Sequence, residues 1–297
     1  MGDNVIKVPC GNCIGCRLER SRQWAIRCHH ESTLHEFNCF LTLTYNPEHE
    51  HLLRKVDKET GEVVLSLNKR DIVLFLKKFR KEVYKRYGSH LRFFQCGEYG
   101  EICKNCGRSK KQCRCSQWNP MPGRPHHHLI VFGFDFPDKQ LHDLNNGFPI
   151  YRSPMLEELW KYGFSTVAGV TWESAAYVAR YVTKKINGSK AVDHYGCRLP
   201  EYVTMSRRPG IAREFAEEYL SSIYPKDSLQ VRPGLVARPP RYYDKIYEAL
   251  HSDKFVEIKQ KRRRKALENV EEQTLERLAV KEKLQIIRSE QLIRPIE

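Results

Sequence analysis

The sequence contains no long hydrophobic run. None of its 297 residues belong to a stretch of about 18 consecutive apolar residues, the length that a helix needs to cross a bilayer. The first residues also lack the apolar segment of a secretory signal peptide. We therefore expect a soluble protein that has no membrane partner and works inside a cell.

Acidic residues are too few to balance the basic ones. The chain has 36 Asp and Glu against 51 Lys and Arg, which gives a formal net charge of +15 and a pI near 9.3. Such an excess favours a polyanionic partner, and nucleic acid is the commonest one. The alternative is a basic surface that binds nothing.

Without an export signal, the eleven cysteines have no oxidising compartment in which to form disulfides. Four of them form a CxxC and a CxC joined by a short basic loop, a spacing that closes a tetrahedron around one zinc ion. We predict a structural Zn²⁺, because all four ligand positions are filled: Cys103, Cys106, Cys113 and Cys115.

A second cysteine group lies near the start of the chain. Its CxxCxxC spacing suits Zn²⁺ or an iron–sulfur cluster and comprises Cys10, Cys13 and Cys16. A fourth ligand must come from elsewhere, and the candidates are Cys28, His29 and His30. Reduced, packed thiols are the alternative. A helix is expected to follow, from Leu18 to Leu34.

Three consecutive histidines open an apolar, β-branched stretch that we interpret as a buried strand, from His126 to Phe132. Pro125 precedes it and Gly133 ends it. Because strand side chains alternate, His126 and His128 share a face about 7 Å apart, while His127 points the opposite way. Two imidazoles on one face are typical of a metal site. A histidine-rich surface strand is the alternative.

The neighbouring segments predict further elements. Cys39–Tyr45 alternates as a strand, Asn68 is placed to cap a helix, and a strand from Leu91 to Cys96 leads to Glu98 and Glu101. The expected fold is α+β, with a central antiparallel sheet that carries the histidine strand and helices on one face.

Another helix is expected from Glu173 to Ile186, with Thr171 as its cap and Gly188 as its stop. Tyr177 and Tyr181 are four residues apart on it and therefore lie one turn above each other. Lys184 continues that face, and Lys185 is adjacent. Taken alone, the pair is also consistent with partly buried structural tyrosines.

Several segments together resemble the replication-initiation proteins of the microviruses of the gokushovirus branch, small phages with single-stranded DNA. They are CGNCIGCRLERSRQWAIRC, CFLTLTYN, FFQCGEYGE, GRPHHHLIVFGFDFPD, ESAAYVARYVTKKI and EYVTMSRRPGI. The resemblance covers roughly residues 5 to 250. That family belongs to the HUH endonucleases. Two features depart from its pattern: His127 replaces a bulky apolar residue, and the stretch from Cys103 to Cys115 is an insertion.

The resemblance implies rolling-circle replication. One tyrosine cuts the origin strand, keeps the 5′ phosphate as a phosphotyrosine and frees a 3′ hydroxyl for host polymerase and helicase, and the second tyrosine acts after one round. A tyrosine titrates near pH 10 and needs help as a nucleophile at pH 7. Mg²⁺ or Mn²⁺ on His126 and His128, with Glu98 as the third ligand and Glu101 as its rival, would polarise the phosphate. Lys184 and Lys185 would stabilise the transition state. The expected location is the cytoplasm of an infected bacterial host.

Outside this site, we count Arg180, Arg207 and Arg208 as candidate DNA contacts. The expected organisation is a cysteine-containing segment over residues 1–30, an HUH-type domain over 31–250 with the cysteine knuckle at 102–118, and a charged helical tail over 251–297. Two other functions remain open. One is a zinc-stabilised DNA-binding protein without catalysis, and the other is a plasmid or transposon relative of the same superfamily.

Overall fold

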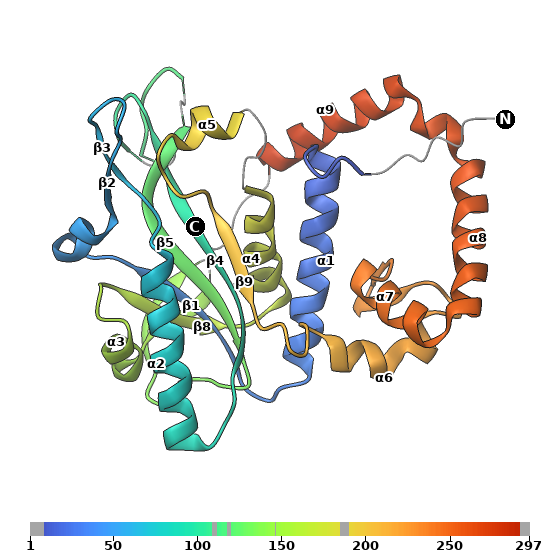
Figure 1. Ribbon diagram of the computed structural model, residues 1–297, viewed down its shortest axis with the longest axis horizontal. Coiled ribbons are helices and arrows are strands. Elements are labelled where there is room, and N and C mark those ends of the chain that lie inside the picture. The colour runs from blue at the N-terminus through green and yellow to red at the C-terminus, as the bar shows by residue number, and fades with distance from the viewer. Residues whose placement is uncertain (1–8, 109–111, 118–119, 146, 185–189, 292–297) are drawn as a thin grey trace.

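The computed structural model describes residues 9–108, 112–117, 120–145, 147–184 and 190–291. Its main element is a seven-stranded sheet whose paired strands are antiparallel, in the order β6-β7-β8-β1-β5-β4-β9 (Figure 1). In that order the strands are Gln140–Asn145, Phe148–Arg152, Ser165–Gly169, Asn38–Thr44, Pro120–Phe132, Arg92–Cys103 and Tyr202–Met205. The predicted antiparallel sheet, with the histidine strand β5 near its centre, is confirmed.

Helices cover both faces of the sheet. From the sequence we expected helices on one face. Side chains of β5 alternate between two separate hydrophobic clusters, so that Ile130 and Phe132 enter one and Leu129 and Val131 enter the other. The first cluster is completed by α1 (Ile14–Thr33) and α4 (Trp172–Lys184), and the second by α2 (Lys69–Tyr87) and α3 (Pro154–Leu159). A strand that is apolar on both sides must be covered on both sides.

The hairpin of β4 and β5 is longer than predicted. β5 begins at Pro120 instead of His126, and its pairing with β4 extends to Cys103. Before His126, β5 pairs with β4 and no longer with β1. A strand with one unpaired edge tolerates proline, which explains why Pro125 does not end it.

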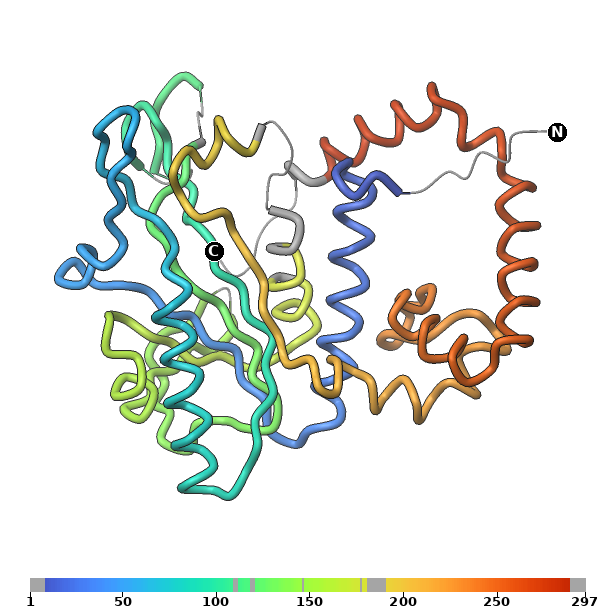
Figure 2. The backbone as a smooth tube through the Cα atoms, in the orientation of Figure 1, coloured from blue at the N-terminus to red at the C-terminus, as the bar shows by residue number. Residues whose placement is uncertain are grey.

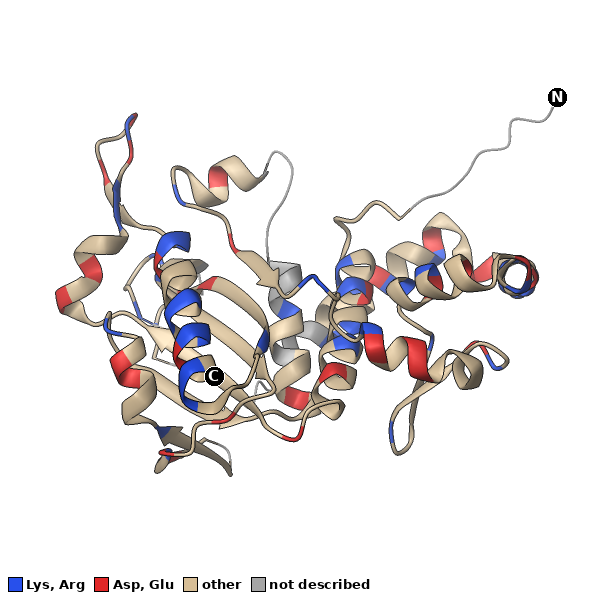
Figure 3. Ribbon diagram, turned by 60° about the horizontal axis from the view of Figure 1, so that its bottom comes forward, with Lys and Arg blue, Asp and Glu red and all other residues tan. Residues whose placement is uncertain are grey.

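The helix α2 carries a row of exposed cations. Its buried residues Ile72, Phe75 and Phe79 recur at helical spacing and face the sheet. Asn68 caps it as expected, because its side chain accepts from the backbone N–H of Arg70. The exposed basic residues follow one another along the helix in Figure 3: Lys69, Arg70, Lys77, Lys78, Arg80, Lys81, Lys85 and Arg86.

The C-terminal third forms a module beside α1. It consists of α6 (Arg213–Ile223), the hairpin β10–β11 (Leu229–Arg232 and Leu235–Ala237), α7 (Arg241–Leu250), α8 (Ser252–Glu268) and α9 (Leu275–Gln291). The expected charged tail is therefore two helices, interrupted by a short 3₁₀ turn at Val270–Gln273. In the chain trace of Figure 2, α1 lies between the sheet and this module.

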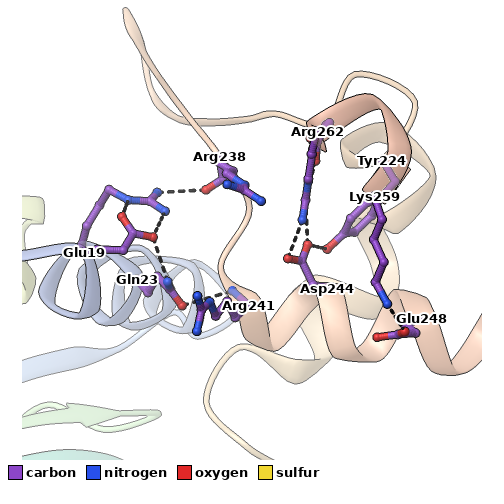
Figure 4. A network of polar contacts seen from close by, with 11 residues as sticks. Glu19, Gln23, Tyr224, Arg238, Arg241, Asp244, Glu248, Lys259 and Arg262 are labelled. Atoms are coloured by element: carbon purple, nitrogen blue, oxygen red, sulfur yellow. Dashed lines mark hydrogen bonds and ion pairs between the residues drawn. The ribbon is translucent and has the colours of Figure 1, made fainter. Parts of the chain in front are cut away.

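Polar contacts fix the module internally and to α1 (Figure 4). Arg262 of α8 donates to Asp244 and to Asp227, each at 2.8 Å, and the Tyr224 hydroxyl donates to Asp244. Toward α1, Arg22 donates to the carbonyl oxygen of Arg238 at 2.9 Å. Phe255 of α8 is buried in the first hydrophobic cluster, so the start of α8 belongs to the packed structure.

Smaller elements complete the chain. They are the 3₁₀ helix Pro47–Leu53, the hairpin of β2 (Arg54–Val56) and β3 (Val63–Leu65), and α5 (Lys190–Tyr195). Throughout the residues that are described, no helix is both long and apolar enough to cross a membrane.

Candidate functional site

Three side chains converge on the face of the sheet that α1 and α4 cover. Nε2 of His126 lies 2.7 Å from Oε1 of Glu98, and Nε2 of His128 lies 2.9 Å from the same oxygen. Glu98 of β4 is paired directly with His126 of β5, so strand register alone brings them together. The three ligand atoms lie within 4.8 Å of one another, as atoms around one metal ion do. We call these residues the metal cluster.

Neighbouring groups fix the orientation of both imidazoles. Nδ1–H of His126 donates to the carbonyl oxygen of Arg124 at 3.2 Å, and Nδ1 of His128 shares a hydrogen bond with Oγ1 of Thr42 at 3.0 Å. Thr42 lies opposite His128 in the β1–β5 register. Metal-binding histidines commonly engage one ring nitrogen in this way, which leaves the other, here Nε2, for the ion.

The metal cluster is most exposed on the side of His126. Glu98 is 1% exposed and His128 5%, whereas the side chain of His126 is 18% exposed. A carboxylate at this depth requires a compensating positive charge. Two imidazole nitrogens and one carboxylate oxygen suit a divalent transition metal or Mg²⁺, and three protein ligands leave coordination positions for a substrate or water. The donor set therefore fits the predicted ion.

His127 faces the opposite side of the sheet, as strand alternation requires. It is fully buried, and burial lowers its pKa to about 3, so the ring is neutral. Nε2–H of Gln95 donates to its Nδ1 at 3.3 Å, and Oε1 of Gln95 accepts from Thr204. The central histidine is thus a core residue between Tyr45 and Trp160.

Of the two rival carboxylates, the structure brings Glu98 to the histidines. Glu101 is exposed and lies opposite Pro122, beyond a register shift between Tyr99 and Glu101. Such an irregularity changes the direction of the residues that follow it.

The helix α4 contains the two candidate tyrosines, Tyr177 and Tyr181. Ser174 donates to the Thr171 side chain at 3.2 Å, so the predicted cap is present. Ala175 and Val178 are buried against the first hydrophobic cluster, and α4 contacts β4, β5 and β9. The helix of Tyr177, Tyr181 and Lys184 therefore lies on the sheet face that carries the metal cluster. The side chains of these three residues, and Lys185 and Gly188 entirely, lie outside the described part.

The four cysteines of the predicted knuckle lie together at the end of the β4–β5 hairpin. Sγ of Cys103 is 4.0 Å from that of Cys115, and Sγ of Cys106 is 3.8 Å from that of Cys113. A zinc–sulfur distance of about 2.3 Å gives a tetrahedron with edges of about 3.8 Å. These separations therefore match one zinc ion held by four thiolates.

The N-terminal cysteines also form a cluster, with three members. Sγ of Cys10 is 3.9 Å from that of Cys16, and Cys13 completes the group. The structure does not bring Cys28 to it. Cys28 lies twelve residues farther along α1, about 18 Å at 1.5 Å per residue, and is fully buried in the core. His29 and His30 are excluded as well, because they pack beside Trp172 and Tyr243.

The predicted arginine contacts are distributed over the molecule. Arg180 is a half-buried residue of α4. Arg207 and Arg208 are exposed in the turn after β9, next to Phe93. Phe93 is five residues before Glu98 on β4, about 17 Å along the strand. The two exposed arginines thus lie on the edge of the sheet, away from the metal cluster.

Sequence reasoning missed the residues that orient the imidazoles. Thr42 was visible only as one polar residue in an alternating strand, and nothing local indicates that it meets His128. Pairing between β1 and β5 joins residues 86 positions apart, and one sequence contains no record of that register.

Comparisons with known proteins agree on a function in replication. A family described as replication-associated protein ORF2/G2P matches residues 38–186, from β1 to the end of α4. The replication-associated protein VP4 of Bdellovibrio phage phiMH2K is 31% identical over 271 residues, which cover 90% of this chain and 75% of that protein. The replication-associated protein ORF2 of Spiroplasma virus 4 is 31% identical over 87% of this chain and 74% of its own. The replication-associated protein ORF4 of Chlamydia phage 1 is 30% identical over 83% of this chain and 55% of its own length. No solved structure matches.

Proposed function

This chain belongs to the family of replication-associated proteins ORF2/G2P, and on that basis we propose that it initiates rolling-circle replication of a phage genome by nicking single-stranded DNA at an origin. The observation that carries the proposal is the cluster of Glu98, His126 and His128 on the sheet face that also holds α4. A DNA-binding module without catalysis has no use for such a cluster. The reaction would take place in the infected bacterial cell.

In the proposed reaction, the hydroxyl oxygen of Tyr177 or Tyr181 attacks the scissile phosphorus. The bond from phosphorus to the 3′ oxygen breaks, the 3′ oxygen takes up a proton, and the 5′ phosphate remains on the tyrosine. Because the phosphotyrosine bond conserves the energy of the phosphodiester, the free 3′ hydroxyl can later reverse the step and close a circle. Two tyrosines allow two such transfers in succession.

The chain's other groups position the phosphate and offset its charge. Glu98, His126 and His128 would hold Mg²⁺ or Mn²⁺, which supplies charge to a phosphoryl oxygen and orients it. Lys184 and Lys185 follow the tyrosines and would stabilise the additional negative charge of the transition state. Arg180, Arg207 and Arg208 would bind phosphates outside the reacting group.

The cysteine clusters have a structural role in this proposal. Cys103, Cys106, Cys113 and Cys115 would hold one Zn²⁺ with no position left for a substrate. Cys10, Cys13 and Cys16 would supply three ligands to a second ion at the start of α1. Host polymerase and helicase are the partners that extend and unwind the nicked strand.

Covalent capture of DNA tests this function. Incubated with Mn²⁺ and single-stranded DNA bearing the phage origin, the protein should form an adduct that survives boiling in detergent. A label 3′ of the nick should stay with the protein, and a label 5′ of it should be released. The double variant Tyr177→Phe/Tyr181→Phe should form no adduct yet bind DNA nearly as well, because binding rests mainly on Lys and Arg contacts to phosphate.

The single variants serve as controls. Tyr177→Phe and Tyr181→Phe each keep a ring of similar size, and at least one of them should still cut. An adduct in the double variant would show that another residue is the nucleophile. Cleavage without any adduct in the wild type would indicate attack by water and would contradict an initiator that rejoins strands.

A further inference from the structure

A row of paired residues extends from the metal cluster across two more strands. Glu98 pairs with His126, and His126 pairs with Thr44. On its other side, the backbone N–H of Thr44 donates to the carbonyl oxygen of Phe164 at 2.9 Å. The pairing of β1 with β8 ends at Leu43 and Ser165, so Phe164 is the next residue in that register.

Strand alternation assigns Phe164 to the face of the metal cluster. Residues that lie directly opposite each other in antiparallel strands share a face. The hydrogen bond between Thr42 and His128 fixes which face that is, and Ala168 of β8 packs into the hydrophobic cluster on the same side. Phe164 is two and four residues from Thr166 and Ala168, and therefore has the same orientation.

Phe164 is 64% exposed. Single exposed apolar residues are common and carry no meaning by themselves. This one lies two strand spacings from His126, about 10 Å across the sheet, on the side of the metal cluster that is open. An aromatic ring at that place faces the path of a polymer whose phosphate is bound at the cluster.

The backbone of this segment is held rigidly. Nε1–H of Trp160 donates to the carbonyl oxygen of Thr44 at 2.9 Å, and the N–H of Asn46 donates to that of Tyr162 at 3.0 Å. Gly163 leaves no space for a side chain, because a Cβ there would collide with the backbone of Thr44, Tyr45 and Asn46 at the end of β1. Phe164 therefore has a fixed position relative to His126.

We propose that Phe164 is a stacking site for a nucleobase of the bound single strand, beside the scissile phosphate. Stacking on an aromatic ring accepts any base, since each has a π-face. Exposed Lys161 in the same turn supplies positive charge for a flanking phosphate, whereas Arg124, two residues before His126, is paired with Glu50 at 2.9 Å. The proposal rests on the proposed nuclease function and adds the element that positions the strand for it.

Binding measurements on two phenylalanine variants test it. The affinity for an origin oligonucleotide with a fluorescent label, measured by anisotropy, should fall about tenfold in Phe164→Ala. Phe164→Trp keeps a stacking surface and should bind as tightly as the wild type. The matched control is Phe37→Ala. Phe37 is 56% exposed and precedes β1 at its far end, about 23 Å from Thr44, so its removal should have no effect.

The base itself reports on the contact. With 2-aminopurine placed next to the nick, wild type and Phe164→Trp should quench its fluorescence, and Phe164→Ala should not. Unchanged affinity and quenching in Phe164→Ala would overturn the stacking site, and so would an equal loss in Phe37→Ala. If a wild type that binds and quenches through Phe164 never forms the covalent adduct, the nuclease is refuted and the stacking site stands. If the adduct forms normally while Phe164→Ala behaves as wild type, the stacking site is refuted and the nuclease function stands.

Discussion

At the scale of single residues, the three histidines have different roles because their side chains lie on different faces of the sheet. His126→Ala and His128→Ala each remove an imidazole from the metal cluster, and we expect them to abolish Mn²⁺ binding and cleavage. His127→Ala should leave Mn²⁺ affinity nearly unchanged but lower the free energy of unfolding by about 1 to 3 kcal/mol, because it empties a buried position. Calorimetric titration with Mn²⁺ and urea unfolding measure the two effects separately. Equal loss of Mn²⁺ affinity in all three variants would contradict the alternation.

The two carboxylates offer a matched pair. Glu98→Gln keeps the size of a buried side chain and removes its charge, so it should weaken Mn²⁺ binding by a factor of ten or more. Glu101→Gln makes the same chemical change at an exposed site and should bind as the wild type does. The reverse result would make Glu101 the ligand.

The residue scale also shows the limit of sequence reasoning. The face shared by His126 and His128 follows from strand periodicity alone, and the structure has that geometry. The choice between Glu98 and Glu101 could not be made, because it depends on where β4 pairs with β5 and on the irregularity after Tyr99. Local sequence patterns predict the face on which a strand side chain lies, but they do not predict which residue of another strand it contacts.

At the scale of elements, the β4–β5 hairpin joins two clusters that we predict to bind metal ions. Its end holds the cysteine knuckle, in which the four sulfurs have the spacing of a zinc tetrahedron. The knuckle could be predicted because its ligands are close in sequence. The extension of the hairpin from His126 back to Pro120 could not be predicted. Prolines normally end a strand and are tolerated here only along an unpaired edge.

We predict one tightly bound zinc ion in the knuckle. The variant Cys106→Ser/Cys113→Ser should lose one equivalent of zinc by metal analysis and melt at a lower temperature, because metal binding contributes to folding. Cys197→Ser is the matched control. Cys197 is a half-buried cysteine outside both clusters, and its variant should keep its zinc. Unchanged zinc content in the double variant would refute the site, and a zinc-free variant that is as stable as the wild type would deny it a role in folding.

At the scale of the whole molecule, α1 connects the sheet to the C-terminal module. Arg22 in its first half donates to the carbonyl oxygen of Arg238, Gln23 accepts from the backbone N–H of Arg241 at the start of α7, and its second half buries His30 against that helix. These contacts join positions more than 200 residues apart and are not apparent from the sequence, from which residues 251–297 were predicted as a charged helical tail. The proposed domain boundaries are untested by this arrangement and remain a prediction.

The buried His30 makes this junction sensitive to acid. Burial lowers its pKa from 6.5 to about 3, with a smaller contribution from the neighbouring His29, and Nδ1 accepts from the Tyr243 hydroxyl at 2.8 Å. Between these values the unfolded chain binds a proton that the folded chain does not. Stability should therefore fall as the pH decreases below 6.5, and this residue should account for about 2 kcal/mol of the loss by pH 5.

Urea unfolding at pH 7.5 and pH 5 checks this prediction by comparing the wild type with His30→Gln. The variant cannot take up that proton in either state, so the stability difference between the two pH values should be smaller. The carboxylates and the other histidines titrate alike in both proteins and cancel. An identical loss in both proteins would contradict the assignment.

Three histidines in succession also make strand β5 easy to misalign. Moving it by one residue against β4 would place His127 beside Glu98 and push both working imidazoles into the core. A shift of two residues would still leave one histidine at the metal cluster. The three histidines alone therefore do not specify the register of β5 against β4. The correct register must therefore be specified elsewhere: by the pairing of β5 with β1, and by the four cysteines at the end of β4 and in the segment that connects it to β5. We expect a zinc ion there to fix the register of the hairpin, so that its removal would impair the proposed cleavage although no residue of the metal cluster is changed.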